Sequence, residues 1–147
     1  MQAQIEPAAA ALWESVSTTT SASGIDEQQP QTQEEWYALR RHAITLIEAT
    51  NLLLVDGRQV VKKGQQLEDA HVPGVLPAAR IQTAITQDRA GFIERAHALH
   101  DAGVQALAAI DARNPEHLLK AGGHIESACE ACHQKYWYPD EKLPWER

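Results

Sequence analysis

Cysteine is nearly absent from this chain, because its 147 residues contain only Cys129 and Cys132. Two cysteines are too few for the disulfide framework of a small secreted scaffold or for a four-cysteine zinc site. Long apolar runs are also missing, and no stretch is suited to cross a membrane. The chain must therefore fold around an ordinary hydrophobic core, which leaves its two cysteines for one local piece of chemistry.

Basic residues are outnumbered, with 13 Lys and Arg against 20 Asp and Glu, and the formal net charge is −7. This balance excludes a nucleic-acid binder and favours basic or neutral protein partners. Phenylalanine occurs once, and alanine is frequent whereas β-branched runs are rare. The composition therefore favours helices over sheets, and the length allows one domain with a sizeable core.

The two cysteines stand in the pentapeptide Cys129-Glu130-Ala131-Cys132-His133, near the C-terminal end. Thiols three residues apart lie on one face of a helix, where each can bond a vinyl group of the same porphyrin. His133 follows one turn after Cys129 and is directed at the iron. The motif predicts covalently attached haem c, with a redox dithiol and a metal site as the alternatives.

Helical periodicity predicts four helices. The first follows a capping box at Thr32 and runs to Val55; a shorter one covers Arg58 to Ala70. The third runs from about Pro77 to Arg113, and the fourth starts at Asn114, carries the haem motif and stops before Pro139. Because short loops join these helices and no strand pattern is found, we expect an all-α antiparallel four-helix bundle.

Residues 1 to 31 are rich in Gln, Ser, Thr and Ala, so we expect a disordered N-terminal arm before a haem-binding bundle over residues 32 to 147. The alternative is a brief helix around Ala8 to Val16, with Trp13 docked on the body. The start of the chain has no secretory signal pattern. Since haem is attached covalently outside the bacterial cytoplasm, we expect a periplasmic protein whose export signal has been removed.

Residues 33 to 138 resemble the cytochrome c′ family, which includes low-spin, methionine-ligated relatives. The resemblance rests on Cys-x-x-Cys-His-x-x-Tyr close to the C-terminus, after an alanine-rich third helix and Gly122-Gly123. The segment Arg40-Arg41-His42-Ala43-Ile44 adds to it, because it is similar to the family's Arg-x-x-Ala-apolar pattern. Two positions depart from the family: Leu39 replaces an aromatic residue, and Trp137 follows Tyr136 where the family usually has a basic residue.

The resemblance implies a role for each matching residue. Cys129 and Cys132 would be the thioether anchors, and His133 the proximal ligand of the iron. Arg40 would approach a haem propionate, while Ile44 would cover the distal face of the iron. Methionine ligation is not expected, because Met1 is the only methionine in the chain.

His42 is the rival of Ile44 for the distal face. Residues two apart on a helix point about 200° away from each other, so the two side chains cannot face the same haem. His42 shares a stripe with Leu39, Leu46 and Leu53, and periodicity slightly favours that stripe as the core. Only the family pattern favours Ile44, with His42 as the alternative that would supply a sixth ligand.

An apolar distal face would leave the iron five-coordinate and able to bind NO or CO. We therefore expect a mono-haem cytochrome that transfers electrons to redox partner proteins. The alternatives are a gas-binding or sensing module without electron transfer and, on the dithiol reading, a thiol-disulfide oxidoreductase in which Cys129 attacks. No catalytic constellation is recognisable, so we do not expect an enzyme. Family members often pair through their first two helices, which leaves a homodimer open.

Overall fold

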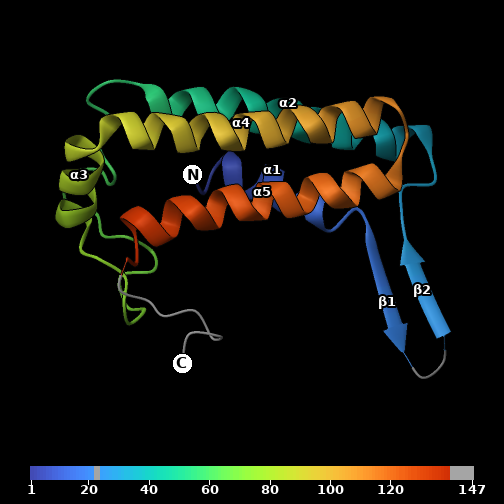
Figure 1. Cartoon of the computed structure of the whole chain (residues 1–147), viewed down its shortest axis with the longest axis horizontal. Helices are drawn as coiled ribbons and strands as arrows, with labels where there is room; N and C mark the ends of the chain where they lie inside the picture. The colour runs from blue at the N-terminus through green and yellow to red at the C-terminus, as the bar shows by residue number, and fades with distance from the viewer. Residues whose placement is uncertain (22–23, 140–147) are drawn as a thin grey trace.

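The computed structural model describes residues 1–21 and 24–139 and consists mainly of helices packed side by side (Figure 1). Three helices are long, and together with a short N-terminal helix they enclose the core. The elements in chain order are α1 (Ile5–Trp13), β1 (Ser17–Ser21), β2 (Gly24–Gln28), α2 (Gln33–Leu54), α3 (Ala78–Gln87), α4 (Arg89–Asp111) and α5 (Pro115–Tyr136).

Two of the long helices begin at caps that the sequence indicates. The Thr32 hydroxyl accepts a hydrogen bond from the Glu35 amide, and the Glu35 carboxylate accepts one from the Thr32 amide, which completes the capping box of α2. At α5 the Asn114 side chain accepts from the amide of His117, and Pro115 occupies the first turn. These bonds satisfy amides that the helices themselves leave unpaired.

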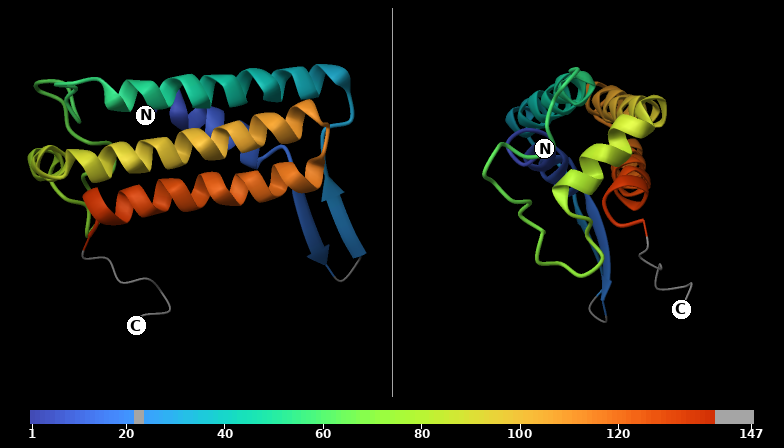
Figure 2. Two further views of the ribbon diagram at one scale, coloured as in Figure 1. Left: turned by 45° about the horizontal axis from the view of Figure 1, so that its top comes forward. Right: turned by 90° about the vertical axis from the view of Figure 1, so that its left-hand side faces the viewer.

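The helices form an antiparallel bundle in which α1 and α4 run opposite to α2 and α5 (Figure 2). At one end of the bundle Arg89, which starts α4, donates to the carbonyl oxygens of Leu53 and Leu54. At the other end Arg40 pairs with Asp111, the last residue of α4. The predicted all-α antiparallel four-helix bundle is thus confirmed, although a different segment supplies its fourth helix.

That fourth helix is α1, which corrects the expectation that residues 1 to 31 form a disordered arm. Ile5, Ala8, Ala9 and Leu12 are each at most 4% exposed and belong to the main core. Trp13 donates from Nε1 to the carbonyl oxygen of Gly122 at 3.0 Å. Composition alone suggested a disordered arm because the Ser- and Thr-rich stretch after Val16 dominates the average over residues 1 to 31. The apolar stripe before it is short, and the helices on which it packs lie far along the chain.

The Ser- and Thr-rich stretch itself forms a hairpin instead of a disordered segment. Strands β1 and β2 pair antiparallel from Ser17 with Gln28 to Ser21 with Gly24. The hairpin projects from the end of the bundle where α4 leads into α5 (Figure 1). These two strands were not predicted because they lack the alternation of apolar and polar residues that marks a half-buried strand.

Two further expectations are corrected at the other end of the bundle. The third helix is broken at Asp88, so that α3 lies across the end of the bundle and only α4 continues along it (Figure 2). Residues 58 to 70 form turns instead of a helix, and Gly57 and Gly64 adopt positive φ angles of 72° and 83°. Glycine adopts such angles readily, and helical residues do not adopt them. Among the described residues, no helix is both long and apolar enough to cross a membrane.

Candidate functional site

The haem motif lies on the inner face of α5, as predicted from its spacing. The apolar stripe of α5 consists of Leu118, Gly122, Ile125, Cys129, Cys132 and Tyr136. Cys129 packs against the main core, whereas Cys132 packs against a second apolar cluster, which we call the Tyr136 cluster. That cluster has Ile81, Ile85, Phe92 and Tyr136 at its centre, with Leu53, Val60, Leu67, Leu76, Ala84 and Trp137 around them. The two thiols therefore face the interior together.

Burial keeps both thiols protonated. It raises the pKa of Cys129 to about 11, and the carboxylates of Glu126 and Glu130 add to this rise. Burial likewise raises the pKa of Cys132 to about 11, although the guanidinium of Arg95 opposes the rise. Both cysteines are free and half-buried. At neutral pH the site thus presents two neutral thiols in apolar surroundings.

His133 lies beside the thiols, with a neutral ring. Burial lowers the pKa of its imidazole, while the carboxylates of Glu130 and Asp69 act in the opposite direction. The ring contacts those of Trp137 and Tyr138, with centroid separations of 5.8 and 6.0 Å. A neutral imidazole is the form that binds a metal ion, so Cys129, Cys132 and His133 form a donor set that suits covalent haem.

A polar network anchors the end of α5 beneath the motif. The Tyr136 hydroxyl donates to Asp88 Oδ2 at 3.0 Å, and Lys135 forms an ion pair with the same carboxylate. Asp88 Oδ1 also accepts from the amide of Gly91, which caps α4. The Tyr136 side chain is 1% exposed and meets Phe92 edge to face. The break between α3 and α4 therefore provides the carboxylate that holds the helix carrying the haem motif.

Replacement of Asp88 by Asn should lower the melting temperature modestly at pH 7, because the carboxylate side chain is 40% exposed and solvent screens part of its charge. Hydrogen bonds from Lys135 and Tyr136 hold the pKa of Asp88 below its usual value, so the charged carboxylate stabilises the fold above the unfolded-state pKa. That contribution disappears as the pH falls through the lowered pKa. The melting temperatures of the two proteins should therefore approach each other as the pH falls below the unfolded-state pKa of about 4, and they should coincide only below the lowered pKa of the folded state.

Glu116→Gln is the matched control for Asp88→Asn. The hydrogen bond from Lys120 likewise lowers the pKa of Glu116, but this pair on the surface of α5 is more exposed than that of Asp88 with Lys135, and among the described residues no buried hydroxyl donates to it. Exposed pairs contribute little to stability, so the control should melt close to the parent protein at each pH. Equal effects of the two variants would show that the Asp88 network does not anchor α5.

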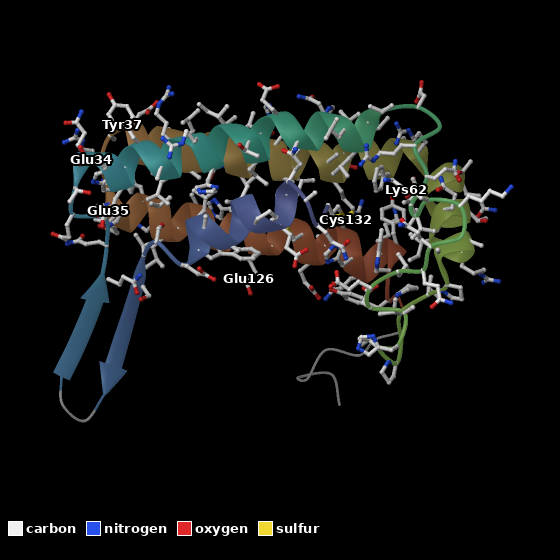
Figure 3. The ribbon with its side chains drawn as sticks, turned by 180° about the vertical axis from the view of Figure 1, so that it is seen from behind. Glu34, Glu35, Tyr37, Lys62, Glu126 and Cys132 are labelled. Atoms are coloured by element: carbon white, nitrogen blue, oxygen red, sulfur yellow. The ribbon has the colours of Figure 1, made fainter. Side chains whose placement is uncertain are left out.

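The structure does not bring Arg40 to the motif. The Arg40 guanidinium pairs with Asp111 at 2.8 Å, whereas Arg95 of the same α4 helix donates to the carbonyl oxygen of Ala131 within the motif. Arg95 and Asp111 are sixteen residues apart on α4, which is about 24 Å along the helix axis. Arg40 therefore lies far from the part of α4 that contacts the motif. In Figure 3, Tyr37, which precedes Arg40 by three residues, and Cys132 lie toward opposite ends of the bundle.

Ile44 and His42 lie on opposite sides of the buried stripe of α2. The core residues of α2 include Leu39, Ala43 and Leu46, while Ile44 is 37% exposed and His42 is half-buried. Leu53 is the α2 side chain that packs against both the main core and the Tyr136 cluster, on which Cys132 also packs. Ile44 precedes Leu53 by nine residues, about 13 Å along the helix.

Sequence reasoning missed Asp88, Leu53 and the contacts of Glu130. A signal existed for Leu53, because the periodicity groups it with Leu39 and Leu46, which are buried in the structure. For Asp88 no local signal existed, since the helical pattern continues through it and its partners Lys135 and Tyr136 are 47 and 48 residues away. Neither residue could be assigned without knowing which helices are neighbours.

Comparison with known proteins gives one solved structure of similar fold, described as cytochrome c′. The match covers 75% of this chain and 74% of that one, with a TM-score of 0.51 and 24% sequence identity. No family model matches the chain, and no curated protein matches it. The comparison therefore establishes the four-helix fold, which agrees with the resemblance found in the sequence.

Proposed function

We propose that this protein is a mono-haem c-type cytochrome, in which Cys129 and Cys132 bind the porphyrin covalently and His133 binds the iron. The observation that carries the proposal is the placement of two inward-facing thiols on one helix with the half-buried imidazole of His133 directly after them. When bound, the haem supplies a one-electron couple and a site for small gases. The fold shared with a cytochrome c′ is the supporting comparison.

The surroundings of the thiols favour haem attachment over dithiol chemistry. Reactive cysteines need a lowered pKa, which the N-terminus of a helix or a nearby cation provides. Here the motif lies in the C-terminal part of α5, where the helix dipole is negative, and burial raises the pKa of both thiols to about 11. Addition of a thiol across a vinyl group consumes no oxidant, so neutral thiols beside an apolar surface suit that reaction.

Electron transfer is the proposed role, with a periplasmic location and redox proteins as partners. A five-coordinate iron is proposed because the aliphatic side chains that surround Cys132 in the Tyr136 cluster, such as those of Ile81, Ile85 and Leu53, cannot bind iron. Such an iron would also bind NO or CO, so a gas-binding module without electron transfer is the second candidate. We propose no enzymatic activity.

The test is an extraction of the protein after expression with haem-maturation machinery and export. Covalent haem should stay with the denatured polypeptide in acidified organic solvent, and the alkaline pyridine spectrum should be that of a haem with two thioether bonds. Extractable haem would contradict the proposal. Protein without haem whose two thiols oxidise and reduce reversibly would support the oxidoreductase instead.

The distal face is tested by spectra of three α2 variants. If an apolar side chain covers the iron, the ferrous protein is high-spin and binds CO without displacing a protein ligand, and His42→Ala leaves its spectrum unchanged. Ile44→Ala or Leu53→Ala should then speed CO binding, because each removes an apolar side chain that could cover the iron. The family resemblance favours Ile44, whereas Leu53 is favoured because it packs on the same apolar cluster as Cys132.

The rival ligand set would give a different pattern. With His42 as sixth ligand, both oxidation states would be low-spin, CO would bind slowly or not at all, and only His42→Ala would convert the protein to high-spin. That result would overturn the five-coordinate proposal and leave electron transfer as the function.

A further inference from the structure

The turn that follows α5 folds back over the imidazole of His133. The amides of Trp137 and Tyr138 both donate to the His133 carbonyl oxygen, at 2.7 and 3.0 Å, and their rings contact the His133 ring. The carbonyl oxygen of Trp137 accepts from the amide of Leu76, which ties the turn to the loop before α3. The chain thus closes one side of the proposed proximal ligand with its own C-terminal turn.

The carboxylate of Glu130 is held at this turn by two hydrogen bonds. The Tyr138 hydroxyl donates to Oε2 at 2.6 Å, and the Gln134 amide donates to Oε1 at 2.9 Å. Glu130 precedes His133 by three residues on α5, so the two side chains share a face of the helix. Tyr138 therefore contacts both the imidazole, through its ring, and the carboxylate, through its hydroxyl.

The charges around the motif are arranged asymmetrically. Negative groups lie near His133, since the carboxylates of Glu130 and Asp69 both act on its imidazole. The cations lie toward α4 and are engaged there: Arg95 donates to the carbonyl oxygens of Gly91 and Ala131, and Lys135 pairs with Asp88. No basic residue directly follows Tyr136, because that position is occupied by Trp137.

We infer that Glu130 and Tyr138 form a carboxylate clamp beside His133 that lowers the reduction potential of the haem. The inference rests on the proposed covalent haem with His133 as its ligand. A negative charge held near the iron favours the oxidised form, which carries one more positive charge than the reduced form. Tyr138 acts as the positioning residue, because its hydroxyl holds the Glu130 carboxylate while its ring contacts the imidazole of His133.

The test is a spectroelectrochemical titration of purified holoproteins in which covalent haem has first been verified. Glu130→Gln should increase the ratio of reduced to oxidised protein at a fixed potential by about tenfold, which is about 59 mV for a one-electron couple. Tyr138→Phe keeps the ring over His133 and frees the carboxylate, so its potential should rise by a smaller amount. This second variant keeps the test informative if Glu130→Gln is poorly folded.

Glu126→Gln is the matched control, because it removes the same charge from the same helix one turn earlier (Figure 3). Its side chain is exposed, makes neither of the Glu130 hydrogen bonds and does not act on His133, so its potential should rise clearly less than that of Glu130→Gln. Equal potentials in Glu126→Gln and Glu130→Gln holoproteins, or a lower melting temperature without a shift in potential, would overturn the clamp alone. Protein without covalent haem would overturn the proposed function and the clamp with it.

Discussion

Deletion of residues 1–16 should abolish cooperative folding of the bundle. The deletion removes the buried side chains of Ile5, Ala8, Ala9, Leu12 and Val16, and it uncovers the faces of α2 and α5 that α1 contacts. A two-state protein is stable by only about 5–15 kcal/mol, and loss of several core side chains exceeds that margin. Circular dichroism should show a broad melting curve in place of the sharp transition of the full chain in the same haem state.

Single substitutions in α1 test the contribution of its packing to stability without shortening the chain. Leu12→Ala should lower the free energy of unfolding by about 2–5 kcal/mol, because Leu12 is 1% exposed and leaves a cavity. Trp13→Phe should cost about 1 kcal/mol through loss of the hydrogen bond to Gly122. Glu6→Gln on the exposed face is the control and should change stability by less than about 0.5 kcal/mol. A truncated chain that melts within a few degrees of the full one would contradict the packing of α1.

Joint replacement of Cys129 and Cys132 by Ala should eliminate covalent haem entirely. Each thiol provides one thioether bond in the proposed attachment, so the double variant keeps only the ligation of iron by His133, which acid breaks. Either single variant should retain haem through one bond, with an alkaline pyridine spectrum displaced from that of the parent. Acidified organic extraction followed by absorption of both phases measures the outcome.

Ser127→Ala provides the control for the cysteine variants. Ser127 is exposed on α5, and its hydroxyl donates only to the carbonyl oxygen of Gly123 in the same helix. The control should therefore retain its haem fully. Haem that resists extraction from the double variant would show attachment at other residues and would contradict the roles assigned to Cys129 and Cys132.

Local signals predicted the long helices and the placement of the motif. The capping box at Thr32 and the Asn114-Pro115 pair each mark a helix start within the sequence itself, and both helices begin there in the structure. The spacing of Cys129, Cys132 and Tyr136 likewise placed them on one stripe of α5, and their burial agrees with that expectation. These features depend on residues within one or two helical turns, so periodicity and capping chemistry suffice.

The side of α2 that faces the core could not be settled in this way. Both the His42 stripe and the Ile44 stripe carry apolar residues, and the choice depends on where α4 and α1 pack. In the bundle Gly103 of α4 lies so close to α2 that an added Cβ would stand 3.0 Å from Ile47. With α1 and α4 packed on α2, Leu39, Ala43 and Leu46 are the buried residues, a result that only the neighbouring helices determine.

By itself the sequence determined the helical class, the caps of α2 and α5 and the grouping of Cys129, Cys132 and His133, because each of these depends on neighbours in the chain. Only the tertiary structure decided that α1 completes the bundle, that Asp88 breaks a helix to hold Tyr136, and that Glu130 and Tyr138 meet beside His133. The physical reason is that these outcomes depend on burial and on polar partners supplied by other elements. Helical periodicity contains no information about those partners until the helices pack.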